Sequence, residues 1–232
     1  MSFIITTFLE VLKGLPYTLL ITCIAMLIGF LIGGLFAWIQ LKPIPVLSQC
    51  VTVYNSFIRS TPLIVQLFIF YYGLPTLILW INHTFQHDIN PDIMPPLAIA
   101  CVAFSFHAIA YLSESIKSGL LSVPRSQMEA AQTIGLSQWQ AYRRIIIPQA
   151  LGYALPNIEN QLIMLIKGTS LAFAIQIPEI IGRSQVIANE GYRFVEVYTV
   201  AVIFYWGIAI LLEFIFHRFE LKTTRYLRVK SS

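Results

Sequence analysis

Charged residues are scarce in this chain. Asp, Glu, Lys and Arg together make up 11% of the 232 residues, whereas soluble domains average about 25%. Hydrophobic residues make up 57%, and the mean hydropathy is +0.73. This composition excludes an ordinary soluble domain and indicates a membrane protein. We interpret the net charge of +4 as a bias that sets membrane orientation, and not as a surface that binds nucleic acid.

Motifs for catalysis are absent as well. The sequence has no G-x-x-x-x-G-K-[ST] loop, so the chain cannot bind ATP by a P-loop, and it has neither a G-x-S-x-G elbow nor an H-E-x-x-H helix. Cys23, Cys50 and Cys101 form no C-x-x-C pair and are interpreted as buried, reduced thiols. The His and Asp residues between Asn82 and Pro95 are irregularly spaced, which favours a solvated loop over a metal site. We expect no enzyme activity, no cofactor and no metal.

Long apolar stretches dominate what is present. A bilayer core of about 30 Å requires roughly 20 apolar residues per helix. We therefore expect an all-α, polytopic membrane protein in which one domain, residues 1–232, crosses the bilayer five times. The expected spans are Leu15–Leu41, about Ser60–Ile81, about Pro96–Ser115, about Leu151–Ile177 and about Phe194–Phe216.

A ladder of small residues runs along the first span. Ala25, Gly29, Gly33 and Ala37 are each four residues apart, so they share one helix face. Small side chains let another helix backbone approach closely in lipid. The ladder therefore predicts a packing face.

The Lys and Arg residues predict the orientation, because positively charged loops stay in the cytoplasm. Most of them fall in the first loop, the third loop and the tail, namely Lys42, Arg59, Lys117, Arg125, Arg143, Arg144, Arg218, Lys222, Arg225, Arg228 and Lys230. The opposite side holds Lys13, Arg183 and Arg193. The N-terminus is therefore expected outside and the C-terminus in the cytoplasm.

A polar island, residues 124–148, lies between the third and fourth spans. Ser126 and Glu129 have the spacing of a capping box, in which a hydroxyl and a carboxylate each satisfy a backbone amide. Gly135 is the residue type that closes a helix C-terminus in the left-handed conformation. An apolar chain has little reason to carry such a segment unless something docks there, so we interpret it as a cytoplasmic docking segment.

The second half of the island repeats the start signal. Ser137 and Gln140 have the capping-box spacing, and the run Gln138–Ile147 is expected to end at Pro148, which has no backbone N–H to continue a helix. Two short helices joined at a glycine are therefore predicted.

The fourth span is the most polar. Glu159 and Lys167 would each cost about 2.5–3.5 kcal/mol at the bilayer centre, so this helix is expected to line a pathway or a subunit interface. Asn160, Met164 and Lys167 fall on one stripe of a helix. A buried structural pair between Lys167 and Glu159 is the alternative.

The island also carries a family resemblance. Glu129-Ala-Ala131, followed by Gly135 and Pro148, resembles the EAA loop of binding-protein-dependent ABC importer permeases. Further motifs follow in the order of the polar amino-acid branch: Leu15-Pro-Tyr-Thr-Leu19, Arg59-Ser-Thr-Pro-Leu63, Tyr71-Tyr-Gly-Leu-Pro75, Pro148-Gln-Ala150 and Lys167-Gly-Thr-Ser-Leu171. Sequence segments such as Ser56-Phe-Ile-Arg59 are similar to the corresponding segments of the L-cystine permeases within that branch. Glu159, Gly168 and Gln176 depart from the family pattern.

The resemblance implies the MetI-like permease fold with a short cytoplasmic coupling-helix pair. It also implies a second permease subunit in a homo- or heterodimer, two cytoplasmic ATP-binding subunits and an extracytoplasmic solute-binding protein, in the lipid of the bacterial cytoplasmic (inner) membrane. The expected ATPase-coupling residues are Met128, Glu129, Ala130, Ala131, Gly135, Arg143 and Arg144. The expected substrate-pathway residues are Glu159, Asn160, Met164, Lys167, Thr169 and Ser170.

The expected function is therefore import of a polar amino acid, with L-cystine as the substrate, driven by ATP hydrolysis on separate subunits. Three alternatives remain open. The chain could be an ion-coupled secondary transporter, a membrane scaffold that transports nothing, or a permease for arginine, histidine or glutamine.

Overall fold

The computed structural model describes residues 2–42 and 44–223, in which helices are joined by short turns and loops and there is no strand. Its α-helices are α1 Ser2–Leu12, α2 Leu15–Leu41, α3 Pro45–Ser60, α4 Leu63–Phe85, α5 Pro96–Leu121, α6 Arg125–Thr133, α7 Gln138–Ala141, α8 Ile147–Gly168, α9 Ile180–Gly191 and α10 Phe194–Thr223. A π-helical turn, η1 Tyr142–Ile146, joins α7 to α8, and a 3₁₀ segment, η2 Thr169–Ile175, follows α8. Arg225, Arg228 and Lys230 of the basic tail lie outside the described residues.

The expected membrane spans are present. Within the described residues, four stretches are long and apolar enough to cross a bilayer, namely Phe3–Leu41, Leu63–Phe85, Pro96–Leu121 and Phe194–Leu221. A fifth is the pair Gln138–Ile175 and Ile180–Gly191, which is bent by 52° at the break. The predicted all-α fold is confirmed, and it has five spans when this bent pair counts as one.

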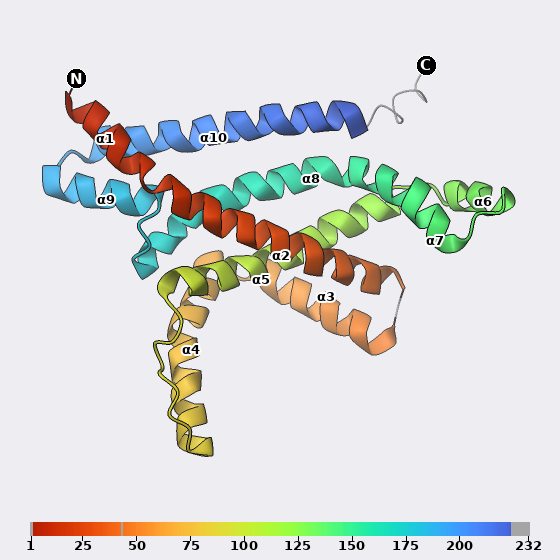
Figure 1. Ribbon diagram of the computed structural model, residues 1–232, viewed down its shortest axis with the longest axis horizontal. Helices are drawn as coiled ribbons and strands as arrows, with labels where there is room; N and C mark the ends of the chain where they lie inside the picture. Colours follow the sequence, from red (N-terminus) through yellow and green to blue (C-terminus); the bar gives the residue numbers. More distant parts are fainter. Residues whose placement is uncertain (1, 43, 224–232) are drawn as a thin grey trace.

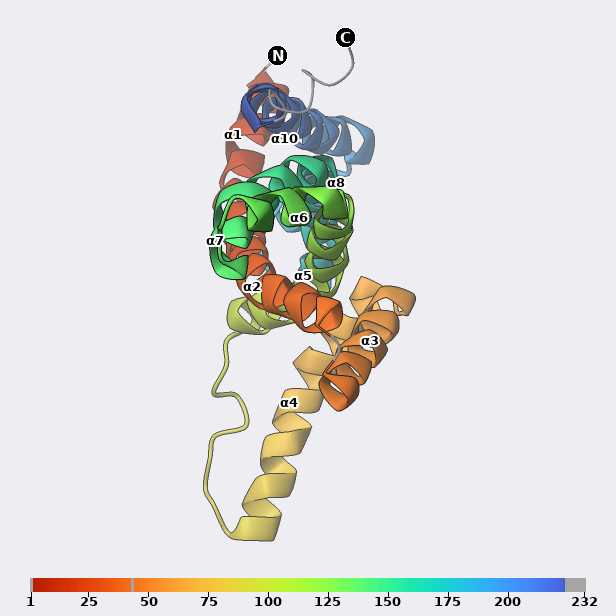
Figure 2. The ribbon, with the colours of Figure 1, turned by 90° about the vertical axis from the view of Figure 1, so that its right-hand side faces the viewer.

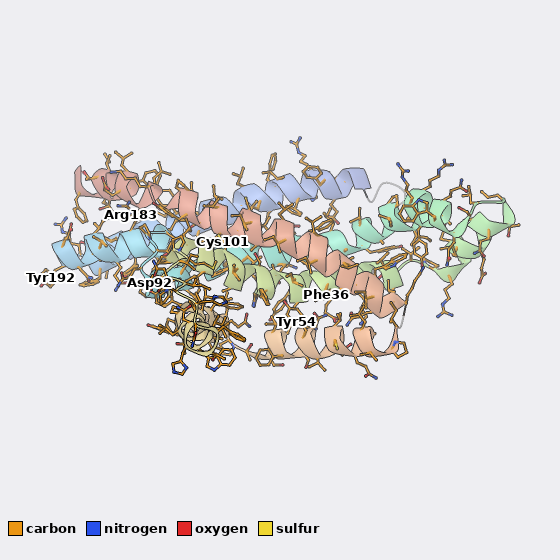
Figure 3. All side chains as sticks on the ribbon, turned by 60° about the horizontal axis from the view of Figure 1, so that its bottom comes forward. Phe36, Tyr54, Asp92, Cys101, Arg183 and Tyr192 are labelled. Carbon is orange, nitrogen blue, oxygen red and sulfur yellow. The ribbon has the colours of Figure 1, made fainter. Side chains whose placement is uncertain are left out.

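Helices α1 and α3 are among those that lie outside the expected spans. The first, α1, packs against α9 and α10, with Val11 fully buried and the Phe8 ring stacked 4.5 Å from the Phe204 ring. The second, α3, lies against α2 and α5, where the Tyr54 ring meets the Phe36 ring at 5.5 Å (Figure 3). Asn55 of α3 also donates to the Glu114 carboxylate of α5 at 3.0 Å.

The small-residue ladder of α2 is the centre of the core. Ala25, Gly29, Gly33 and Ala37 are all buried, and α2 packs mainly against α5. A Cβ added at Gly29 would lie 2.7 Å from the Ala108 Cβ, so no larger residue fits there without displacing the helices. The predicted packing face is confirmed.

Two elements that bear on the candidate site lie at opposite ends of the molecule. The α6–α7 hairpin is at one end, and α9 is at the other (Figure 1). The long helix α4 projects away from the remaining helices in both ribbon views (Figure 2). Helix α8, the predicted pathway helix, runs between the two ends and packs against α5 and α10.

Candidate functional site

The α6–α7 hairpin turns at Gly135. This glycine has φ +83°, in the left-handed region. Its N–H donates to the Gln132 carbonyl at 2.9 Å, and the Leu136 N–H donates to the Ala131 carbonyl at 3.1 Å, which together form a Schellman motif. A Cβ at Gly135 would meet nothing within 4 Å. Backbone conformation, and not crowding, therefore requires glycine here, as the sequence predicted.

Only one of the two predicted capping boxes forms. The Gln140 N–H donates to the Ser137 hydroxyl at 3.3 Å, and the Ser137 N–H donates to the Gln140 side-chain oxygen at 2.9 Å. The prediction of a capping box at Ser126 and Glu129 was wrong. The N-cap of α6 is Pro124, which makes no side-chain bond, and Ser126 already lies inside the first turn.

The prediction that the second helix ends at Pro148 was also wrong. Helical structure continues from Gln138 to Ile175, and Pro148 lies in the first turn of α8. The π turn before it makes this continuation feasible: the Ile147 N–H donates to the Tyr142 carbonyl, five residues back. A π turn widens the helix where a proline ring would otherwise clash with a carbonyl. The hairpin therefore joins α8 without a loop.

The predicted coupling residues do not share one environment. Glu129, Ala130, Gly135, Arg143 and Arg144 are exposed. Met128 is half-buried and packs against the cluster of Val123, Ile146 and Ala150, and Ala131 is buried. Ala131 thus supports the hairpin from inside, and the exposed residues form its outer surface.

Sequence reasoning missed two apolar residues on the hairpin. Ile134 is 74% exposed and Trp139 is 65% exposed, on either side of Gly135. Exposed apolar side chains on either side of the turn make Ile134 and Trp139 candidates for a docking surface. Their position inside an otherwise polar island is the signal that would have found them.

The predicted stripe on α8 is present and faces outward. Asn160, Met164 and Lys167 are all exposed, Met164 by 62%, and Asn157 extends the stripe by one turn. The alternative of a Lys167–Glu159 pair is not observed: no ion pair joins the two in the described chain. Glu159 is instead half-buried within electrostatic range of Glu213, His217 and Glu220 on α10.

The two hydroxyl residues after Lys167 differ. Ser170 is half-buried and donates to the Lys167 carbonyl at 2.7 Å. Thr169 is fully buried and donates to the Ile166 carbonyl at 2.7 Å. The structure therefore places Thr169 apart from the exposed stripe, in the packing between η2 and its neighbours.

A cleft of about 580 Å³ opens beside Lys167 and Ser170. Its far wall is α10, which contributes Tyr205 and Trp206. The Tyr205 hydroxyl donates at 3.1 Å to the carboxylate of Glu179, which is fully buried and also accepts the Ile181 and Gly182 N–H groups at the start of α9. Sequence reasoning assigned no role to these residues, because only the fold brings α9 and α10 to the end of α8.

Comparison with protein families gives one assignment. The family described as "Binding-protein-dependent transport system inner membrane component" matches residues 25–225. Curated relatives include the L-cystine transport system permease protein TcyL of Bacillus subtilis (strain 168), 40% identical over 87% of this chain and 82% of that protein. The L-cystine transport system permease protein TcyB of the same organism is 34% identical over 92% and 86%. The probable amino-acid ABC transporter permease protein PatM of Vibrio harveyi is 36% identical over 87% and 86%.

Solved structures agree with this fold. A crystal structure of an amino acid ABC transporter with histidines matches with a TM-score of 0.77 and 28% identity over 92% of this chain and 94% of that one. An inward-facing MetNI methionine ABC transporter matches with a TM-score of 0.69 over 92% and 96%. At 20% identity, the second likeness concerns the fold alone.

Proposed function

The chain belongs to the family of binding-protein-dependent transport system inner membrane components, as the permease component of an amino-acid ABC importer, and we propose that the amino acid it carries is L-cystine. Two of its relatives are L-cystine permeases by name. The chain itself gives a second reason: the polar stripe of Asn160, Met164 and Lys167 suits a long ligand that has an amino-acid zwitterion at each end.

The outward stripe on α8 is the observation that carries this proposal. Asn160 and Lys167 are seven residues apart, which is about 10 Å along a helix axis. The two α-carbons of a disulfide-linked pair are about 4.4–6.8 Å apart, so a cystine lying along the stripe would span from one polar group to the other. Lys167 would pair with one carboxylate and the Asn160 amide would bind the other end. The polarizable thioether of Met164 would lie beside the apolar centre of the ligand.

The proposal gives secondary roles to three other predicted pathway residues, Ser170, Thr169 and Glu159. Ser170 lines the same cleft as Lys167. Because its hydroxyl proton is donated to the Lys167 carbonyl, its oxygen would accept a hydrogen bond from an ammonium group of the ligand. Thr169 would act only by positioning η2, because it is buried. Glu159 faces α10, so a role with the ammonium groups requires the ligand to reach the α8–α10 side.

A permease of this kind requires ATPase subunits and a second permease. We assign docking of the ATPase to the exposed residues of the α6–α7 hairpin, Glu129, Ala130 and Gly135, with Arg143 and Arg144 as a charged rim. Movement of the ATPase subunits would push this hairpin and, through the continuous run from α7 to α8, tilt the stripe between the two membrane faces. The hairpin would face the cytoplasm, and a solute-binding protein would dock at the α9 end, with the N-terminus outside.

Reconstitution tests the substrate. The chain is co-expressed with the ATPase, permease and binding-protein products of its neighbouring genes, and the complex is placed in proteoliposomes. We expect ATP-dependent uptake of labelled L-cystine that excess arginine, histidine or glutamine does not suppress. Uptake of one of those amino acids with no uptake of L-cystine would show that the proposed substrate is wrong and would identify that amino acid as the substrate. Uptake by the chain alone along an ion gradient would favour a secondary transporter.

A further inference from the structure

A second cleft lies at the end of the molecule opposite the α6–α7 hairpin. It has a volume of about 390 Å³ and lies between the end of η2 and helix α9. Figure 3 locates this helix by Arg183 and Tyr192. Three side-chain amides line the cleft, those of Gln176, Gln185 and Asn189. We call it the amide cleft.

The amides of this cleft have no hydrogen-bond partner within residues 2–42 and 44–223. None of the side chains of Gln176, Gln185 and Asn189 makes a hydrogen bond or ion pair with another part of the described chain. The rest of the lining is apolar, apart from the backbone, and contains no ionisable side chain. The lining of the cleft thus combines an apolar wall with three uncharged amides and carries no net charge.

The walls of the cleft are held rigidly. Glu179, fully buried, caps the first turn of α9 by accepting the Ile181 and Gly182 N–H groups. A Cβ at Gly182 would clash with the Ile177 carbonyl, so α9 lies directly against the end of η2. Gln176 has φ +64°, a conformation that costs an L-residue roughly 1–2 kcal/mol. Glycine would avoid that strain, and a strained backbone of this kind is often found where a ligand binds.

The amide cleft is connected to the pathway. Phe173 lines both the amide cleft and the cleft beside Lys167, so its side chain separates the two spaces. A ligand in the amide cleft is therefore separated only by the Phe173 side chain from the cleft beside Lys167, at the C-terminal end of the α8 stripe.

We propose that the amide cleft is an outer binding site for a net-neutral, zwitterionic amino acid on its way to the Lys167 cleft. This inference rests on the proposed import function and adds the site that receives the substrate first. An amide offers an acceptor oxygen for an ammonium group and N–H donors for a carboxylate. The lining contains no negative charge that could compensate a net positive charge on the ligand. The free-energy cost of desolvation is therefore larger for a cationic amino acid than for a zwitterion. The volume falls in the range of about 300–1,000 Å³ that is typical of ligand pockets.

The test uses the complete transporter in proteoliposomes with saturating binding protein. Gln185→Leu removes one amide at similar size. Gln176→Gly removes another and relaxes the backbone, so a loss in this variant is not a folding defect. Gln86→Leu is the matched control, because Gln86 is also exposed and left-handed, with φ 53°, but lies at the end of α4. The readouts are amino-acid uptake and ATP hydrolysis stimulated by loaded binding protein.

We expect Gln185→Leu and Gln176→Gly each to lower uptake about tenfold, which corresponds to one hydrogen bond to a charged ligand group. Stimulated ATP hydrolysis should stay within twofold of the wild type, and Gln86→Leu should change neither readout. Uptake unchanged in both cleft variants would overturn the proposal. So would a parallel loss of uptake and ATP hydrolysis, since that would mean a failure to engage the binding protein.

The wild type separates this inference from the proposed substrate. If it imports glutamine and not L-cystine, the substrate proposal fails, and the cleft variants are measured with glutamine. If the wild-type transporter imports only arginine, the proposal that the amide cleft binds a net-neutral amino acid fails as well.

Discussion

Gly135→Val should uncouple ATP hydrolysis from transport while the protein still inserts into the membrane. At φ +83° a β-branched residue is in a conformation that costs an L-residue roughly 1–2 kcal/mol or more. Because a Cβ there has open space within 4 Å, this backbone strain is the whole cost. An energy of about 1–2 kcal/mol changes an equilibrium about 5- to 30-fold. The ratio of hairpins that keep the Schellman turn to hairpins that lose it should fall by that factor.

The assay is the ratio of amino acid imported to ATP hydrolysed in proteoliposomes. We expect this ratio to fall at least fivefold in Gly135→Val, together with weaker co-purification of the ATPase. Gly135→Asn should retain most of the coupling, because asparagine tolerates the left-handed conformation better than other residues. Gly73→Val is the second control: a Cβ at Gly73 also has open space, but Gly73 has no positive φ. Normal ATP-driven uptake in Gly135→Val would refute a coupling role for the hairpin.

Three further changes test other parts of the molecule. Lys167→Met should lower L-cystine uptake at least tenfold with ATP hydrolysis retained, and unaltered uptake and affinity would remove Lys167 from the pathway. Trp139→Ala should weaken co-purification of the ATPase about 30-fold if the exposed indole anchors the interface, whereas Trp80→Ala, equally exposed on α4, should not. Tyr205→Phe removes a 3.1 Å hydrogen bond to the buried Glu179 carboxylate, so a thermal melt should show a Tm lower by roughly 3–10 °C; an unchanged Tm would show that this bond adds nothing to stability.

Local signals in the sequence predicted the features that depend on neighbouring residues. The first span was predicted with the bounds that α2 has, Leu15–Leu41, because Pro16 suits a first turn and Lys42 follows the apolar run. The left-handed Gly135 and the box of Ser137 with Gln140 were predicted from residue type and spacing alone. Each of these features is decided within one or two helical turns.

Apart from the small-residue packing face of α2, features that depend on packing were not predicted. Pro148 is a helix terminator by local rules, but the π turn accommodates it and α8 continues. The face of Thr169 could not be read from a 3.6-residue period, because the helix changes to the 3₁₀ form at that residue and its period shortens to about 3.0. The amide cleft and the Glu179–Tyr205 contact join α9 to residues distant in sequence, and no periodicity indicates such a contact.

The junction between hairpin and pathway is the step on which coupling depends. From Ala141 to Asn160 the helical run covers 19 residues, about 29 Å, which is close to the thickness of a bilayer core. A push at the hairpin can therefore reach the stripe only if the π turn between them does not absorb it, and π turns are weaker than α-helical ones. Two contacts hold this turn: the Tyr142 ring meets the Trp38 ring of α2 at 4.9 Å, and Ile146 is buried against Val123. Because these contacts hold the turn on two sides, we expect α7, η1 and α8 to move as one body, so that in the proposed mechanism the hairpin, the π turn and the stripe would act as a single lever.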